Sequence, residues 1–187
     1  PSPLTFIFPH HDLIGYKNFH IFQNDNEISL PFFSNQSLDA PDGSIQKVII
    51  VIHGANRNAE DYYNSIYNNA FDLNVLAETI IIAPQFLITT DLNYWQPSTA
   101  YAFWSSTTPW SSGAQSHSTG AHPRDYEISS YTIMDSLIAQ LLITYPNLQD
   151  SALVGNSAGG QFVNRYAAGS DQEAGGKIRY IVSAPSS

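Results

Sequence analysis

A serine stands on a glycine-flanked bend late in the chain. Residues 155–159 read Gly-Asn-Ser-Ala-Gly, with a short apolar run before them and a helix-like run after them. This G-x-S-x-G pattern on a strand-to-helix turn lifts the serine hydroxyl clear of a sheet. Glycine fits at the flanking positions because larger side chains would collide there. Ser157 is therefore the candidate nucleophile.

The position of Ser157 would also favour negative charge. At a helix N-terminus it lies among free amides and at the positive end of the helix dipole. The amide of Ala158 then points at the oxyanion of a tetrahedral intermediate. The competing interpretation is an ordinary glycine turn between a strand and a helix. A dinucleotide loop does not fit, because residues 155–160 do not give G-x-G-x-x-G, and no Walker A sequence occurs.

The elements that must position Ser157 alternate between strands and helices. Continuous apolar runs predict buried strands over 47–52, 79–83, 152–154 and 178–182. The helices between them are predicted from apolar stripes or turn signals: Tyr63, Ile66, Tyr67 and Ala70 for one; Met134, Leu137, Ile138 and Leu141, capped by Ser129 or Ser130, for another; and residues 159–168, closed by Gly169, for a third.

This order predicts an α/β fold with a mostly parallel sheet and helices on both faces. Two further strands, over 19–23 and 28–33 with the turn signal 24–26 between them, predict an N-terminal antiparallel hairpin. We expect one domain over 1–187, in which 1–46 is the hairpin region and 85–124 a long aromatic-rich insertion. Chemistry would gather beyond the carboxyl ends of the parallel strands.

A second sequence element falls where a site would need it. His53-Gly54-Ala55-Asn56 follows the buried strand 47–52. With this element, the chain from about residue 47 onward resembles the α/β-hydrolases, a superfamily of serine esterases, lipases and peptidases. The matching stretches are HGANRN at 53–58 and GNSAGGQFVNRYA at 155–167. Asn156 departs from the commonest form of the second stretch, in which histidine often stands at that position.

The resemblance implies a serine hydrolase that cleaves a carboxylic ester through an acyl-enzyme. Ser157 would be the nucleophile, and the amides of Ala158 and Ala55 would hold the oxyanion, with Asn56 the second candidate for the latter. The substrate would be a small-molecule or polymer ester. Peptidase or amidase activity is the close alternative, because the same machinery serves both. A non-catalytic binding protein of the same fold is the alternative from another class.

The partners that a catalytic serine needs do not follow it. In this superfamily the chain order is serine, then Asp or Glu, then His. After Ser157 the acidic residues are Asp171 and Glu173, and no histidine occurs. The histidines all come earlier: His10, His11, His20, His53, His117 and His122. We therefore expect the triad acid and histidine to lie outside this chain.

Three explanations of the missing partners are open. The favoured one is that the chain is a fragment, or that a second polypeptide completes the fold. Alternatively, His117 or His122 reaches Ser157 from the long insertion, or the protein is not catalytic. We expect His53 to make a structural hydrogen bond near the oxyanion loop.

The insertion carries every tryptophan of the chain. Trp95, Trp104 and Trp110 lie within 16 residues of one another after the strand 79–83. One interpretation is a substrate wall that binds an acyl, sugar or aromatic group. The alternative, which we favour, is a small core that packs the insertion against the sheet.

Composition excludes several other classes of function. The net charge is −9 with only 7 Lys and Arg, which disfavours nucleic acid and anionic membranes as partners. Cysteine is absent, so disulfides and thiolate metal sites are excluded. No apolar run is long enough to span a bilayer.

We expect neither a metal nor an organic cofactor. The acidic balance and aromatic-rich insertion favour a secreted or periplasmic location.

Overall fold

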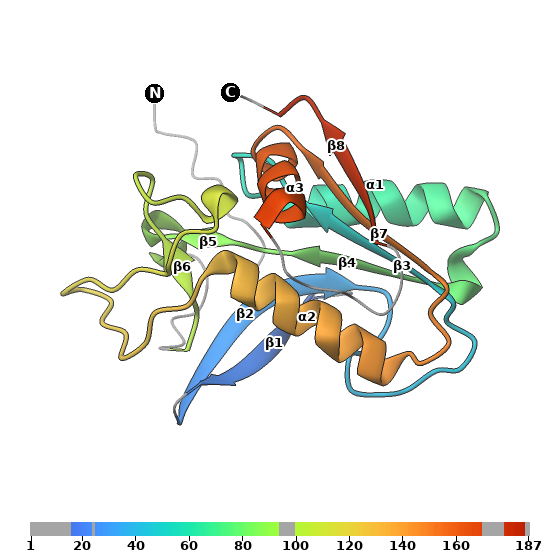
Figure 1. Ribbon diagram of the computed structural model, residues 1–187, viewed down its shortest axis with the longest axis horizontal. Helices are drawn as coiled ribbons and strands as arrows, with labels where there is room; N and C mark the ends of the chain where they lie inside the picture. The colour runs from blue at the N-terminus through green and yellow to red at the C-terminus, as the bar shows by residue number, and fades with distance from the viewer. Residues whose placement is uncertain (1–15, 24, 94–99, 170–177, 186–187) are drawn as a thin grey trace, which may run out of the picture.

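The computed structural model describes residues 16–23, 25–93, 100–169 and 178–185. These residues form a six-stranded sheet in the order β1-β2-β4-β3-β7-β8 (Figure 1). The strands are β1 (Tyr16–Gln23), β2 (Asn26–Ser34), β3 (Lys47–Ile52), β4 (Thr79–Pro84), β7 (Asp150–Asn156) and β8 (Ile178–Ser183).

The central strands are parallel, as predicted. β3 pairs in parallel with β4 on one side and with β7 on the other, and β7 pairs in parallel with β8. β1 and β2 form the predicted antiparallel hairpin, which joins the sheet through an antiparallel pairing of β2 with β4. β7 is longer than its apolar residues 152–154 suggested, because its ladder with β3 runs from Asp150 to Gly155.

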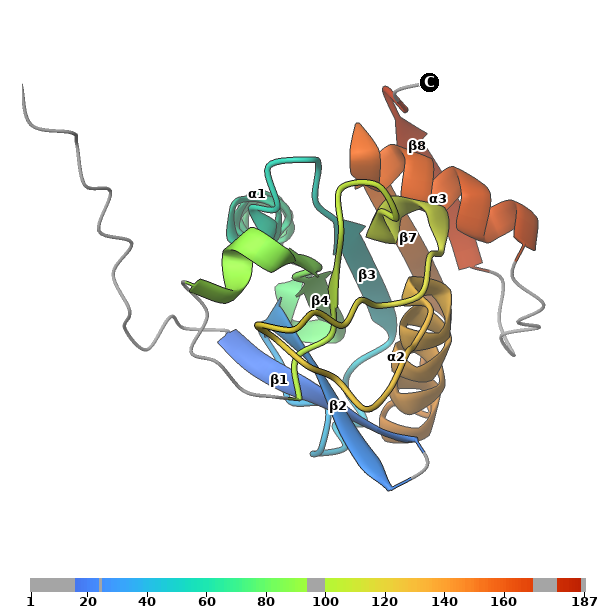
Figure 2. The ribbon, with the colours of Figure 1, turned by 90° about the vertical axis from the view of Figure 1, so that its left-hand side faces the viewer.

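Helices cover both faces of the sheet. α1 (Ala59–Asp72) lies on one face, and α2 (Ser130–Thr144) and α3 (Ala158–Gly169) lie on the other (Figures 1 and 2). Side chains of a strand alternate between its two faces. Accordingly, Val51 packs in the cluster under α1, whereas Ile50 and Ile52 pack in the cluster under α2 and α3.

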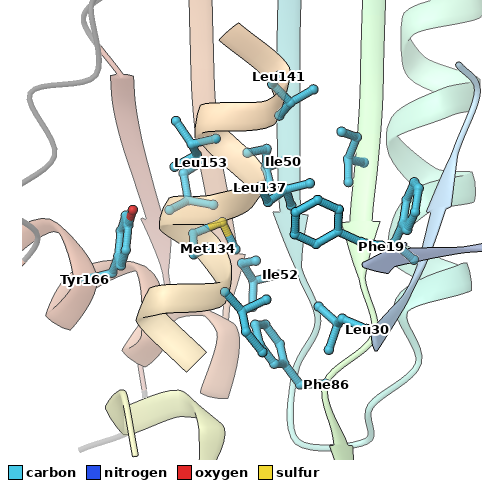
Figure 3. Close-up of a cluster of buried hydrophobic side chains, with 14 of the residues drawn as sticks. Phe19, Leu30, Ile50, Ile52, Phe86, Met134, Leu137, Leu141, Leu153 and Tyr166 are labelled. Carbon is cyan, nitrogen blue, oxygen red and sulfur yellow. The ribbon is translucent and has the colours of Figure 1, made fainter. Parts of the chain in front are cut away.

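The larger core lies under α2. Met134, Leu137 and Leu141 point from this helix toward Ile50 and Leu153 of the sheet (Figure 3). Phe19 and Leu30 reach the same core from the hairpin. The side chain of Ser129 accepts a hydrogen bond from the Tyr131 amide at 3.1 Å, so Ser129 is the cap that begins the helix.

The described part of the segment after β4 is mostly irregular but contains short elements. They are β5 (Leu87–Ile88), β6 (Phe103–Trp104) and the 3-10 turns η2 (Thr89–Asn93) and η3 (Trp110–Ser112), while another 3-10 turn, η1 (Leu76–Glu78), precedes β4. β5 and β6 pair in parallel. The hydroxyl of Ser130 donates to the Trp110 carbonyl at 2.6 Å, which ties this segment to the start of α2.

Pro84 belongs to β4, one residue beyond the predicted strand 79–83. It stands opposite Phe32 of β2 at the end of the ladder. A proline lacks an N–H donor but is tolerated where a strand terminates, because one ladder bond is then not needed. The following Gln85 amide resumes the contact by donating to the Pro31 carbonyl at 2.8 Å.

Replacing Leu137 with alanine should lower the free energy of unfolding by about 2–5 kcal/mol. Leu137 is 1% exposed on the inner face of α2. Ile143→Ala is the matched control, because Ile143 lies on the same helix and is 75% exposed. The control should change stability by no more than about 0.5 kcal/mol. Urea unfolding followed by circular dichroism measures both, and equal losses would contradict the assigned inner face of α2.

Candidate active site

The site lies where the strand order reverses direction. β3 is flanked by β4 on one side and β7 on the other, so the chain leaves β3 toward one edge and later returns to its other side. In open α/β sheets a crevice forms at such a switch point, beyond the carboxyl ends of the strands. The loop after β3 begins at His53, and the turn after β7 carries Ser157. Both candidate elements therefore meet at the switch point.

Ser157 occupies a strained turn between β7 and α3. Its φ is +56°, a left-handed conformation that non-glycine residues seldom adopt. Its amide donates to the Ser183 carbonyl of β8 at 3.1 Å, and its carbonyl accepts from the Gln161 amide at 2.9 Å. Strain of this kind costs on the order of 1–3 kcal/mol and persists only where the surroundings impose it. Here β8 and the first turn of α3 impose it.

The flanking glycines leave no space for a side chain, as the sequence pattern predicted. A Cβ added to Gly155 would lie 2.2 Å from the Gly159 carbonyl oxygen. A Cβ added to Gly159 would lie 2.2 Å from the Ile52 carbonyl oxygen and 2.6 Å from that of His53. These neighbours are backbone atoms that cannot rotate away. Backbone contact within the turn thus requires glycine at position 155, and contact with the end of β3 requires it at position 159.

The start of α3 presents free amides beside Ser157. Ala158 is the first residue of the helix, and the first amides of a helix have no intrahelical acceptor. In the part of the chain that the structure describes, no backbone or side-chain acceptor bonds the Ala158 amide. The positive end of the helix dipole adds to the field at this point. The arrangement can stabilise an anion next to the Ser157 hydroxyl.

The loop after β3 approaches Ser157 closely. A Cβ placed on Gly54 would lie 3.7 Å from the Cβ of Ser157. The Gly54 carbonyl accepts from the Arg57 amide at 3.1 Å and from Nδ1 of His53 at 2.8 Å. In a trans peptide the carbonyl and the next amide point in opposite directions. The Ala55 amide is therefore directed away from the buried His53 ring, on an exposed residue followed by the exposed Asn56.

An ion pair that the sequence analysis missed holds this loop. Arg57 has a φ of +54°, and its guanidinium donates to Asp91 through Nε at 2.7 Å and through Nη2 at 3.2 Å. Nη1 donates to the Ala55 carbonyl at 2.7 Å, while Asp91 also accepts from the Ile88 amide at 2.8 Å. The two side chains are mostly shielded from water. No local pattern pairs residues 34 positions apart, so sequence alone gave no signal for it.

His53 makes the predicted structural hydrogen bond and a second one. Its Nδ1–H donates to the Gly54 carbonyl, and its Nε2 accepts from the Phe86 amide at 3.0 Å, which fixes the neutral tautomer. The ring is fully buried and lies edge-on to Trp110 at a centroid distance of 4.7 Å. Burial lowers the pKa of His53 from 6.5 to about 4. With both nitrogens occupied, His53 is a structural bridge between the ends of β3 and β4.

The other histidines within the described ranges lie in different surroundings. His117 and His122 both pack edge-on against Phe103, at 6.0 Å and 6.2 Å between ring centroids. His20 hydrogen-bonds Ser29 in the hairpin at 3.0 Å. None of these described rings makes a hydrogen bond to Ser157. His10 and His11 lie outside the described residues.

The tryptophans that the structure describes are built into the core. Trp104 is fully buried and donates from Nε1 to the Ala114 carbonyl at 2.8 Å. Trp110 is 4% exposed and stacks on Phe86 at 5.0 Å between centroids. The burial supports the small-core interpretation for these two residues, because Trp104 offers no exposed face to a ligand. Trp95 lies outside the described residues.

The residues that the structure describes contain no group of three or more His, Cys, Asp or Glu side chains placed to hold a metal ion. Their helices also include none that is long and apolar enough to cross a bilayer.

Within the described ranges the chain has an α/β fold. A mostly parallel sheet carries helices on both faces and an antiparallel hairpin at its N-terminal edge, with a glycine-flanked serine at the switch point. No family model and no curated protein matches the sequence.

Solved structures with a similar arrangement are hydrolases by name. Poly(aspartic acid) hydrolase-1 from Sphingomonas sp. KT-1 gives a TM-score of 0.47 at 23% identity, over 81% of this chain and 50% of that one. Siderophore hydrolase EstB from Aspergillus nidulans gives 0.44 at 16% identity, over 83% and 52%. S-formylglutathione hydrolase FrmB from Staphylococcus aureus gives 0.38 at 14% identity, over 78% and 48%. The chain thus spans about half the length of these proteins.

Adding a methyl group at Gly155 or Gly159 should disrupt the Ser157 turn. The contacts of 2.2 Å described above force the backbone apart, so we expect a loss of several kcal/mol in unfolding free energy or failure to fold. Gly169→Ala, at the other end of α3, is the control, because nothing lies within 4 Å of its added Cβ. Thermal unfolding of the three variants compares them. A Gly159→Ala protein as stable as Gly169→Ala would contradict the close packing.

Stability should fall as the pH drops from about 6.5 to about 4, partly because of His53. In this window an unfolded histidine binds a proton that the buried ring, with its pKa lowered to about 4, does not. The unfolding free energy then decreases by up to about 1.4 kcal/mol per pH unit. His53→Gln should lose this part of the slope in urea titrations at several pH values. His122→Gln, the control, should keep it. Parallel slopes for wild type and His53→Gln would count against a buried neutral ring.

Proposed function

We propose that the protein is a serine hydrolase that cleaves a carboxylic ester through an acyl-enzyme on Ser157. The observation that carries the proposal is the conformation of Ser157 itself. It stands at φ +56° on a strand-to-helix turn whose flanking glycines admit no side chain. Residues held in such strained conformations cluster at active sites and ligand-binding segments.

The proposed first step is attack by Oγ of Ser157 on the ester carbonyl carbon. The new C–O bond forms as the carbonyl π electrons move to the oxygen, and a base takes the serine proton. The amides of Ala158 and Ala55 hold the oxyanion, with Asn56 the second candidate for the latter role. Collapse releases the alcohol, which receives that proton. Water then hydrolyses the acyl-serine by the same sequence in reverse order, giving the acid and free Ser157.

The base and its orienting acid are proposed to come from outside the described residues. Both ring nitrogens of His53 are already engaged, and His117 and His122 pack against Phe103. A histidine supplied by further chain or by a second polypeptide would meet Ser157 on its exposed side. The predicted substrate wall of Trp95, Trp104 and Trp110 stays a prediction, as do peptidase or amidase activity and export from the cell.

A non-catalytic binding protein of the same fold is the second candidate. The observation that favours it is that, in the described ranges, no base is hydrogen-bonded to Ser157. A binding protein would keep the turn for its amides and bind a carboxylate or ester without turnover. The two candidates differ in whether Ser157 can form a covalent bond.

Fluorophosphonate labelling of the full-length protein should attach one probe, at Ser157. An activated serine attacks the phosphorus, and the oxyanion donors stabilise the product. Ser157→Ala should abolish labelling, whereas Ser136→Ala, which removes a serine hydroxyl from α2, should leave it intact. Intact mass and peptide mapping read the outcome. A folded full-length protein that resists the probe would favour the binding protein over the enzyme.

A further inference from the structure

Tyr62 lies on α1, four residues into the helix that follows the loop after β3. Its ring packs against the apolar cluster under α1, and the side chain is only partly buried. The neighbouring Tyr63 is buried in that cluster, and Tyr67 stacks obliquely on Tyr63 at 5.7 Å. The ring of Tyr62 therefore has a packing role, whereas its hydroxyl group has other neighbours.

The hydroxyl of Tyr62 reaches Gly54, next to Ser157. A Cβ added to Gly54 would lie 2.9 Å from the Tyr62 hydroxyl oxygen, 3.7 Å from the Cβ of Ser157 and 3.7 Å from the Asn156 carbonyl oxygen. The space that glycine leaves open is thus bordered by the phenol on one side and by the serine turn on the other. The Tyr62 hydroxyl oxygen therefore lies no further from the Cβ of Ser157 than the sum of their two distances to the added Gly54 Cβ.

This hydroxyl is available as a donor. Among the side-chain hydrogen bonds of the described residues, none involves the Tyr62 oxygen, and the partly exposed phenol can donate its O–H to a bound molecule. The amides of Ala55 and Ala158 belong to the residues that directly follow Gly54 and Ser157 in the chain. A carbonyl oxygen placed between these amides would have the phenol within its surroundings as a further donor.

We propose that Tyr62 is a third oxyanion donor, acting with the amides of Ala158 and Ala55. The inference rests on the proposed function. When Oγ of Ser157 adds to the substrate carbonyl and the π electrons move to its oxygen, Tyr62 donates a hydrogen bond to that oxygen. The phenol keeps its proton throughout, so the serine proton still passes to the base. Because charge on the oxygen is largest in the transition state, the bond strengthens there more than in the bound substrate.

Glycine at position 54 is then explained by function as well as by space. An alanine methyl group would lie 2.9 Å from the phenol oxygen, a contact relieved by swinging the tip of Tyr62 aside. Folding should tolerate Gly54→Ala for this reason. The variant keeps the hydroxyl but moves it away from the reacting atoms.

The test measures ester hydrolysis and fluorophosphonate labelling rates in the full-length protein with Tyr62→Phe. This change removes one oxygen atom and leaves the ring in place. We expect kcat and the labelling rate to fall by about 10²-fold, the loss typical of one oxyanion donor, with KM little changed. Tyr67→Phe, on the same helix, is the matched control and should match wild type. Circular dichroism and thermal unfolding establish that each variant is folded.

A double-mutant cycle separates donation from packing. Gly54→Ala alone should lower the labelling rate, but in a Tyr62→Phe background it should add little, because the displaced hydroxyl is already gone. Independent, additive losses would overturn the proposal, as would a Tyr62→Phe protein that keeps wild-type kcat and labelling rate. If wild type takes up no probe at Ser157, the proposed function fails and this inference falls with it.

Discussion

The candidate site depends on one close approach between two stretches of backbone. Gly159, in the first turn of α3, contacts the carbonyl oxygens of Ile52 and His53 at the end of β3 without room for a Cβ. This contact brings the start of α3 and the loop after β3 to the same point of the sheet. Gly54 lies beside Ser157 in this arrangement, and the bonds of Ser157 to β8 and to the first turn of α3 hold its left-handed φ. The geometry of the site is thus set by backbone packing rather than by flexible side chains.

Uncharged aromatic side chains pack against the loop after β3. His53 bridges the ends of β3 and β4 while remaining uncharged, and Trp110 and Phe86 pack around its ring. Arg57 and Asp91 fasten the outer side of the same loop. The loop is therefore fixed by a buried neutral bridge on one side and by a shielded ion pair on the other. The long segment after β4 supplies part of each, which gives it a supporting role in the site.

Much of this arrangement could be predicted from the sequence because its signals are local. β-branched runs define the parallel strands, and the need for glycine at position 155 comes from a collision with Gly159 within one turn of chain. Distant contacts left no such signal. The left-handed Arg57 and its partner Asp91 are 34 positions apart, and the approach of Tyr62 to Gly54 depends on how α1 packs. The burial of Trp104 was equally open, because aromatic residues serve cores and binding surfaces alike.

The hydrogen bond from the Ser157 amide to the Ser183 carbonyl links the site to the edge of the described sheet. Ser183 is the last residue of β8, whose Ile181 is 49% exposed. A strand with a free edge opens more readily than a central one. Whenever β8 frays at this end, the amide of Ser157 loses its acceptor and exchanges with solvent deuterium. The exchange rate of the Ser157 amide proton thus reports how firmly β8 is held at the edge of the described sheet. Any polypeptide that pairs with β8 would slow this exchange.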